Sequence, residues 1–232
     1  MKNNIFLKFK KAIYYLIEGF IRPIDGSLGE LIRYYWYKNK FISCGINVKI
    51  GINVKFSGCE NIEIGDHVWI DDNTILIAGM PKDFGSREVK IRKTSTKNLP
   101  HGKLKIGSQI HFAPNCIINA FGGGIEIDDY CGFSSGVKIY SMSNHYRSYK
   151  NPNLITYSNP MSKKLPIVLS INPIIIEKNC FISLNSIILG GHISTNSFVT
   201  PNSVLIGGKF KSNSIISGQP AKASGERFKK DE

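Results

Sequence analysis

The segment SMSNHYRSY, residues 141–149, contains a histidine whose surroundings suit acid–base chemistry. Histidine titrates near neutral pH, so His145 can take a proton from an attacking group and return it to a leaving group. Its neighbours Asn144, Tyr146 and Arg147 are candidate substrate-binding residues. Taken alone, a histidine in a polar loop has no catalytic role by default, so the elements that hold it decide its interpretation.

An imidazole base is normally held in orientation by a partner on its second ring nitrogen. No Asp or Glu occurs between Cys131 and Ile176. We therefore expect the partner to be a carboxylate from a neighbouring structural repeat, an acid from another subunit, or a backbone carbonyl. Candidate acids on the preceding repeat are Glu126, Asp128 and Asp129.

The same acid-free stretch is rich in positive charge. Its basic residues include Lys138, Arg147, Lys150, Lys163 and Lys164. Such a cluster is typical of a site for an anionic ligand, either the phosphates of a cofactor or a negatively charged sugar. A solvated basic loop is the alternative.

The whole chain is basic. Its 232 residues carry a formal net charge of +13 and are 42% hydrophobic, which is typical of a soluble globular protein with an anionic partner. The segment RYYWYKNK, residues 33–40, gives slight support to nucleic-acid binding, but no recognised motif does, and no nucleic-acid partner is expected. The five cysteines lack C-x-x-C spacing, which predicts reduced thiols and no metal site.

Residues 1–43 have the period of α-helices, with a break at Pro23 and Gly26. Two interpretations stay open: helices packed on the main domain or a neighbouring subunit, and a basic amphipathic segment in peripheral contact with a membrane. Lysines interrupt the apolar stretch, and no small-residue cleavage site follows it. No apolar run approaches the ~20 residues that span a bilayer. We expect a cytoplasmic protein; contact with the inner face of the membrane belongs to the second of these interpretations.

From residue 44 onward, apolar residues return at every sixth position. Neither a helix nor an alternating strand has this period. A solenoid of very short strands has it, with one inward side chain per strand and a tight corner after it, so that three strands make one triangular coil. The apolar series is Ile64, Ile70, Leu76; Ile106, Phe112, Ile118; Ile127, Phe133, Ile139; Ile176, Ile182, Ile188; and Ile193, Val199, Leu205. Small or polar residues follow them, as at Gly51, Gly65, Gly107, Ala113, Ser134, Ser183, Ser194 and Thr200.

Two long insertions interrupt the period, at about 78–103 and 141–172, and His145 lies in the second. Loops this long inside a compact repeat array are usually functional or disordered. The sequence therefore predicts a mainly β domain at 44–222, preceded by a helical segment at 1–43 and followed by a basic tail at 223–232.

The chain resembles the hexapeptide-repeat acyltransferases, and within them the sugar O-acetyltransferase branch. The resemblance is carried by CGINVKIGINVKFSGCENIEIGDHVWIDD, NAFGGGIEIDDYCGFSSGVKIYSMSNHY, NPIIIEKNCFISLNSIIL and IISGQPAK, which together represent most of residues 44–222. It implies a left-handed parallel β-helix, a homotrimer, acetyl-CoA as acetyl donor in clefts between adjacent β-helices, and His145 as general base.

The resemblance also implies donor-binding residues on the later coils. Those expected to bind acetyl-CoA are Ser183, Thr200, Gly218, Pro220, Ala221, Lys222 and, in the basic tail, Arg227. Where the family often has Val-Trp-Ile-Gly this chain has CFIS, so Phe181 replaces an aromatic residue near the site and bears on the shape of the acceptor.

These features predict an acetyl-CoA-dependent O-acetyltransferase. Its acceptor would be a sugar hydroxyl of a bacterial surface polysaccharide, capsule or O-antigen, or of its precursor, with an anionic sugar favoured by the basic loop. One alternative is an N-acyltransferase on an amino-sugar nucleotide, which depends less on the base because an amine is the better nucleophile. A catalytically silent β-helix trimer that only binds is the other.

Overall fold

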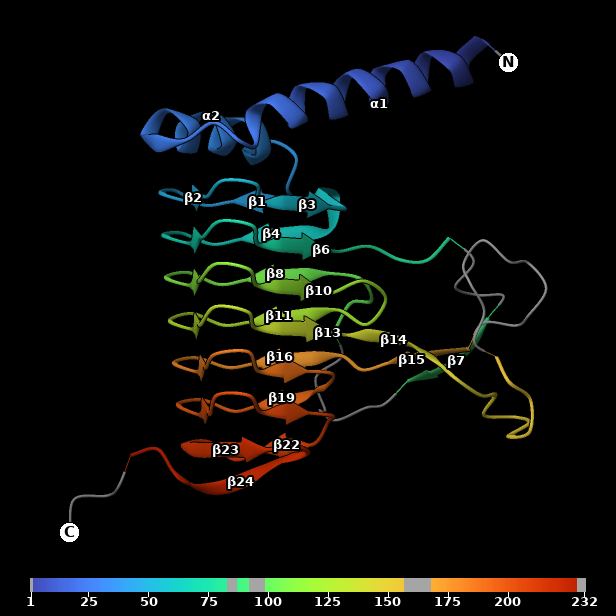
Figure 1. Cartoon of the computed structure of the whole chain (residues 1–232), viewed down its shortest axis with the longest axis vertical. Helices are drawn as coiled ribbons and strands as arrows, with labels where there is room; N and C mark the ends of the chain where they lie inside the picture. Colours follow the sequence, from blue (N-terminus) through green and yellow to red (C-terminus); the bar gives the residue numbers. More distant parts are fainter. Residues whose placement is uncertain (1, 83–86, 92–98, 157–167, 229–232) are drawn as a thin grey trace.

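The computed structural model describes residues 2–82, 87–91, 99–156 and 168–228. Two helices, α1 (Lys2–Ile21) and α2 (Gly26–Lys38), lie across one end of a stack of triangular coils (Figure 1). The coils build three sheets, and neighbouring coils pair their strands in parallel; the last coil contributes strands to the first two sheets. The predicted mainly β, left-handed parallel β-helix with N-terminal helices is confirmed.

The strands of the three sheets follow the coils in order. The first sheet contains β1 (Ser43–Cys44), β4 (Ile62–Ile64), β8 (Leu104–Ile106), β11 (Ile125–Ile127), β16 (Ile174–Ile176), β19 (Gly191–Ile193) and β22 (Lys209–Phe210). The second contains β2 (Lys49–Ile50), β5 (Trp69–Ile70), β9 (His111–Phe112), β12 (Gly132–Phe133), β17 (Phe181–Ile182), β20 (Phe198–Val199), β23 (Ser214–Gly218) and β24 (Ala221–Glu226). The third contains β3 (Lys55–Ser57), β6 (Ile75–Ile77), β10 (Ile117–Asn119), β13 (Lys138–Tyr140), β18 (Ile187–Ile188) and β21 (Val204–Leu205).

The residues of the sixfold series form the core of this stack. Every one of them is buried, and equivalent residues of successive coils pair in register, as Ile118 does with Ile139. Where a glycine follows an inward side chain, the next coil leaves too little room for a Cβ. A Cβ on Gly107, for example, would lie 2.8 Å from the backbone nitrogen of Asp129. Most other corners place an Asn in the left-handed backbone region, which Asn tolerates better than most residues.

The helices close the N-terminal end of the core. Asp25 caps α2 by accepting a hydrogen bond from the Gly26 backbone nitrogen. Arg33 is buried under α2 and donates from Nε to the carbonyl of Ile50 on the first coil, at 2.7 Å. Tyr37 packs beside it against the first coil's Phe56. A short 3₁₀ helix, Cys59–Asn61, joins the first two coils.

The C-terminal end is closed by a strand rather than by a free tail. Residues 223–226, expected in the tail, belong to β24, which pairs antiparallel with β23. The pairing satisfies backbone groups of the last coil that would otherwise be an open sheet edge.

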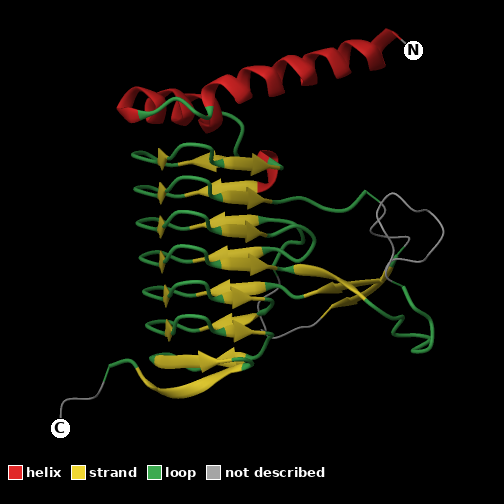
Figure 2. Cartoon of the chain, viewed as in Figure 1, coloured by secondary structure: helices red, strands yellow, loops and turns green. Residues whose placement is uncertain are grey.

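The two insertions meet in a separate three-stranded sheet that projects from the stack (Figure 2). β14 (Met142–His145) pairs antiparallel with β15 (Val168–Ile171), and β15 pairs in parallel with β7 (Glu88–Ile91) of the first insertion. We call this sheet and the loop after His145 the arm. The sequence predicts the insertions separately, and their pairing is a new observation.

All five cysteines are free thiols, as expected. Among the described residues, no helix has both the length and the apolar character needed to span a membrane.

Candidate active site

His145 is the last residue of β14, at the outer end of the arm. Its strand partner is Val168, whereas Met142 at the start of β14 pairs with Ile171 next to the coils. The Thr156 hydroxyl donates to the His145 carbonyl at 2.8 Å and ties the strand end to the loop that follows. The histidine therefore stands away from the core, on a paired strand rather than on an unsupported loop.

A backbone carbonyl orients the imidazole. Nδ1 of His145 lies 2.8 Å from the Arg147 carbonyl oxygen, and the Arg147 backbone N–H points at the same Nδ1 atom from 3.3 Å. The first contact needs a proton on Nδ1 and the second needs a lone pair there, so the contacts hold the ring in place in either tautomer. With the proton on Nδ1, the shorter contact is satisfied and Nε2 is the basic nitrogen of the neutral ring. The rings of Tyr146 and Tyr149 lie on the imidazole, with centroids at 4.7 and 4.5 Å.

Two of the acids expected as orienting partners, Glu126 and Asp129, form ion pairs with lysines. Glu126 pairs with Lys105 at 3.2 Å, and Asp129 pairs with Lys178 at 3.3 Å. Of the alternatives left open by the sequence, the described contacts thus support the carbonyl.

Glu88 holds the loop that follows His145. Its carboxylate accepts from the Ser148 hydroxyl at 2.6 Å, from the Tyr149 backbone nitrogen at 2.5 Å and from the Lys150 backbone nitrogen at 3.0 Å. The hydrogen bond from Ser148, with help from the two backbone donors, holds the pKa of Glu88 below its ordinary value. Sequence reasoning missed this residue because it lies in the other insertion, with no local signal of the pairing.

The expected substrate-binding residues fall into two groups. Asn144, Tyr146 and Arg147 are exposed around His145, and the Arg147 guanidinium lies 5.5 Å from the Tyr146 ring centroid. Phe181 lies on β17 of the second sheet, where its ring covers Gly132. The arm leaves the corner between the third and first sheets, and the second sheet is the face opposite that corner. One chain therefore does not bring Phe181 to His145.

Basic residues accompany the arm. Lys90 lies over the Tyr149 ring at 4.5 Å, and Arg147 and Lys150 are exposed. Lys163 and Lys164, expected in the same basic cluster, lie outside the described residues.

Six of the expected donor-binding residues lie along one corner of the last three coils. The Ser183 nitrogen donates to Val199, and the Thr200 nitrogen donates to Ile216 one coil further, so both stand at the same position of successive coils. The remaining four lie at the turn between β23 and β24: Gly218 ends β23, Pro220 is in the turn, and Ala221 and Lys222 begin β24, where Lys222 pairs with Ser217.

Arg227 is separate from this row. Its Nη1 donates to the carbonyls of Asn179 at 2.6 Å and Ser197 at 3.4 Å, at the corner between the first and second sheets. This is the opposite edge of the second sheet from Thr200. Its guanidinium therefore ties two turns together, a role that the sequence did not indicate.

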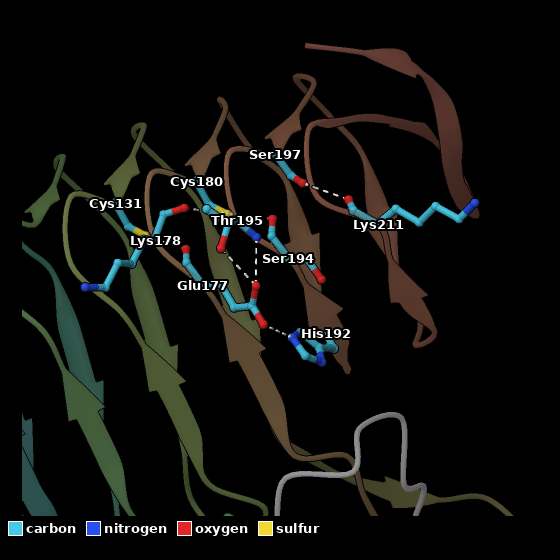
Figure 3. Close-up of polar contacts among 9 residues, drawn as sticks. All are labelled: Cys131, Glu177, Lys178, Cys180, His192, Ser194, Thr195, Ser197 and Lys211. Atoms are coloured by element: carbon cyan, nitrogen blue, oxygen red, sulfur yellow. Dashed lines mark hydrogen bonds and ion pairs between the residues drawn. The ribbon is translucent and has the colours of Figure 1, made fainter. Parts of the chain in front are cut away.

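A second histidine forms a buried polar cluster on the first sheet (Figure 3). His192 Nε2 lies 2.6 Å from Glu177, whose other carboxylate oxygen accepts from the Thr195 nitrogen at 2.9 Å and hydroxyl at 3.0 Å. Burial acts to raise the pKa of Glu177, but these hydrogen bonds outweigh it, and the pKa is lowered. His192 lies in β19, and its contact with Glu177 links neighbouring coils.

No protein-family model matches the chain. A curated relative, the dTDP-4-amino-4,6-dideoxy-D-glucose acyltransferase of Escherichia coli, is 30% identical over 191 residues, which cover 82% of this chain and 84% of the relative.

Solved structures share the fold. A variant of AntD, an N-acyltransferase from Bacillus cereus, solved with dTDP-4-amino-4,6-dideoxyglucose and coenzyme A, matches with a TM-score of 0.65 at 22% identity, over 85% of this chain and 89% of that one. The hexapeptide-repeat acetyltransferase VCA0836 from Vibrio cholerae, solved with acetyl coenzyme A, matches with a TM-score of 0.53 at 18% identity, over 93% and 86% of the two chains.

Proposed function

The chain belongs to the hexapeptide-repeat acyltransferases, and we propose that it is an N-acyltransferase that transfers an acyl group from acyl-CoA to the amino group of a sugar nucleotide. The observation that carries this proposal is the match to the Escherichia coli acyltransferase of dTDP-4-amino-4,6-dideoxy-D-glucose over most of both chains. It favours the alternative raised by the sequence over O-acetylation of a capsule or O-antigen polysaccharide, for which no comparison gives support.

The charge of the chain supports this pair of substrates. Coenzyme A and a nucleoside diphosphate sugar are both polyanions, and the chain has a net charge of +13. In this proposal the exposed Arg147 and Lys150, with Lys90 beside them, attract the diphosphate of the acceptor. The row from Ser183 to Lys222 binds the donor.

His145 acts as the proton acceptor. The neutral amine attacks the thioester carbonyl carbon, a C–N bond forms, and the C–S bond breaks to release the coenzyme A thiolate. The proton lost by the nitrogen passes to Nε2 of His145 and from there to the thiolate. In this proposal Nδ1 carries a proton that the Arg147 carbonyl accepts as a hydrogen bond, which leaves Nε2 free to take the proton of the amine.

The site needs a second copy of the chain. His145 stands on an arm that points away from its own coils, and Phe181 lies on the face opposite the corner from which the arm leaves. A neighbouring copy in a homotrimer would supply the surface that the arm faces, with acceptor and donor between the two β-helices.

Thiol release from acetyl-CoA tests the proposal. The purified chain is assayed with dTDP-4-amino-4,6-dideoxyglucose and, as matched acceptor, with the same sugar nucleotide carrying a hydroxyl at carbon 4. We expect turnover with the amine and little with the hydroxyl. Preference for the hydroxyl would restore the O-acetyltransferase interpretation, and no turnover with either, combined with no binding of acetyl-CoA, would favour the silent β-helix.

A further inference from the structure

The outer face of α1 is apolar and exposed. Glu18 is buried and accepts a hydrogen bond from Tyr37 at 2.6 Å, so its side of α1 faces inward. Ile13 lies five residues before Glu18, Leu16 lies two residues before it, and Phe20 lies two residues after it. At 100° per residue these positions lie on the opposite face of the helix. Leu16 and Phe20 are 61% and 71% exposed.

The second helix repeats the same spacing around a different inward residue. Arg33 is buried against the first coil. Leu28 lies five residues before Arg33, Leu31 lies two residues before it, and Tyr35 lies two residues after it. All three side chains are more than half exposed. They therefore point away from the coils, as the apolar residues of α1 do.

The two apolar faces form one surface at the N-terminal end of the stack. α2 and the C-terminal part of α1 lie across that end, and the N-terminal part of α1 projects beyond it (Figure 1). Both helices turn their inward residues toward the first coil or toward Tyr37. A groove of about 420 Å³ between the helices is lined by Ile21, at the end of α1, and by Leu31 and Tyr35 of α2 among others. We call this surface the apolar end face; its residues are Phe9, Ile13, Leu16, Phe20, Leu28, Leu31 and Tyr35. Soluble proteins rarely expose a contiguous apolar patch of this kind without a binding role.

Positive charge accompanies the apolar end face. Residues 1–40 contain eight Lys and Arg and three Asp and Glu. Lys8, Lys10 and Lys11 are sequence neighbours of the exposed Phe9, and the one acid of α1, Glu18, is buried. The surface therefore complements an anionic partner, whereas a second copy would bring the same positive charge against it.

We propose that the apolar end face binds the surface of an anionic lipid bilayer, with α1 and α2 lying in the plane of the interface. A helix with an apolar face and flanking lysines binds in this way by burying its apolar side chains at the level of the headgroups, while the lysines contact anionic lipids. Such binding would keep the enzyme beside a membrane, whatever its acceptor, and does not depend on the proposed reaction.

Vesicle flotation with the full chain tests the proposal. Vesicles of phosphatidylcholine alone are compared with vesicles that also contain phosphatidylglycerol, at low and high salt. We expect binding to the anionic vesicles that weakens with salt. The double variant Leu16→Ser/Phe20→Ser should lower the partition coefficient about tenfold or more, because two large apolar side chains no longer enter the interface. Replacing Lys8, Lys10 and Lys11 by Gln should reduce binding to the anionic vesicles by about fivefold for each lysine.

The matched control is Leu184→Ser/Ile206→Ser. Both residues are about half exposed on later coils, away from the helices, and their replacement should leave vesicle binding unchanged. Absence of binding to anionic vesicles by the wild-type chain would overturn the proposal. If light scattering then showed a smaller assembly for Leu16→Ser/Phe20→Ser than for wild type, a second copy would be the occupant of this face.

Discussion

Ser148 donates a hydrogen bond of 2.6 Å to Glu88, a residue 60 positions earlier in the chain and in the other insertion. The contact, with the backbone bonds from Tyr149 and Lys150, anchors the loop that carries the carbonyl partner of His145. The geometry of the candidate base therefore depends on a residue that does not touch it.

Replacing Glu88 by Gln should lower the rate of acyl transfer more than the stability of the fold. Gln keeps one acceptor oxygen but loses the charge, so the loop and the orientation of His145 relax, and we expect kcat/KM to fall about tenfold. The melting temperature should move little, because the arm lies outside the core. A large drop in melting temperature with unchanged kcat/KM would contradict this role.

Glu88 also makes the arm sensitive to acid. Its pKa is lowered in the folded chain, so its hydrogen bonds contribute fully above the ordinary glutamate pKa of about 4.3 and are lost as the pH falls through the lowered value. Hydrogen exchange of the Tyr149 and Lys150 amides, measured from neutral pH downward, should accelerate only in that acid range. Protection that persists unchanged through it would show that another group holds the loop.

Loss of the base should reduce activity while leaving the fold intact. We expect His145→Ala to lower kcat with an amino-sugar acceptor by about 10- to 100-fold, less than many general bases contribute, because the amine is already a good nucleophile. The acidic limb of the pH–rate profile, where protonation inactivates a general base, should change with it. His67→Asn is the control, since His67 lies at an exposed corner with a φ of 57° that Asn also adopts. Equal activity of the two variants would exclude His145 as the base.

Acetyl-CoA should raise the thermal unfolding midpoint. A ligand at about 100 times its dissociation constant stabilises the folded state by about 2.7 kcal/mol. Lys222→Gln should weaken this effect, whereas Lys211→Gln, on the opposite edge of the second sheet, should preserve it. If the two variants behave alike, the donor does not bind along the row from Ser183 to Lys222.

The pair of buried His192 and half-buried Glu177 should contribute to stability rather than to catalysis. His192→Ala leaves the carboxylate without its imidazole partner and should cost about 1–3 kcal/mol of unfolding free energy. His192→Gln, which can still donate a hydrogen bond, should cost less. Chemical denaturation measures both, and a loss of kcat in either variant at unchanged stability would point instead to a role at the active site.

Gly107→Ala should destabilise the stack. The added Cβ would lie 2.8 Å from the backbone nitrogen of Asp129, and the overpacking should cost about 1–3 kcal/mol. Gly19→Ala in α1 meets no atom within 4 Å and should be neutral or stabilising, because Ala favours the helix. Thermal unfolding of the two variants compares them directly, and equal midpoints would contradict the assigned role of the small corner residues.

The six-residue repeats made the β-helix predictable from the sequence alone. Ile118 and Ile139 recur at the same point of their repeats, small residues such as Gly107 follow inward ones, and each repeat needs only its neighbours, so a local period determines a whole architecture. The prediction that His145 is the base depends on the same repeats, because its position in the chain is counted from them.

Only the tertiary structure shows which residues from distant segments of the chain contact one another. Glu88 and Ser148 meet because β7 and β15 pair across many intervening residues, a long-range pairing with no periodic signal in either strand. Arg227 is drawn to the turn carbonyls of Asn179 and Ser197 only once the last strand folds back on the stack. The amphipathic period of residues 1–43 predicts two helices but not the surface on which they pack. The packing depends on the buried hydrogen bonds of Glu18 and Arg33, and these contacts place the apolar stripes of both helices on the outside.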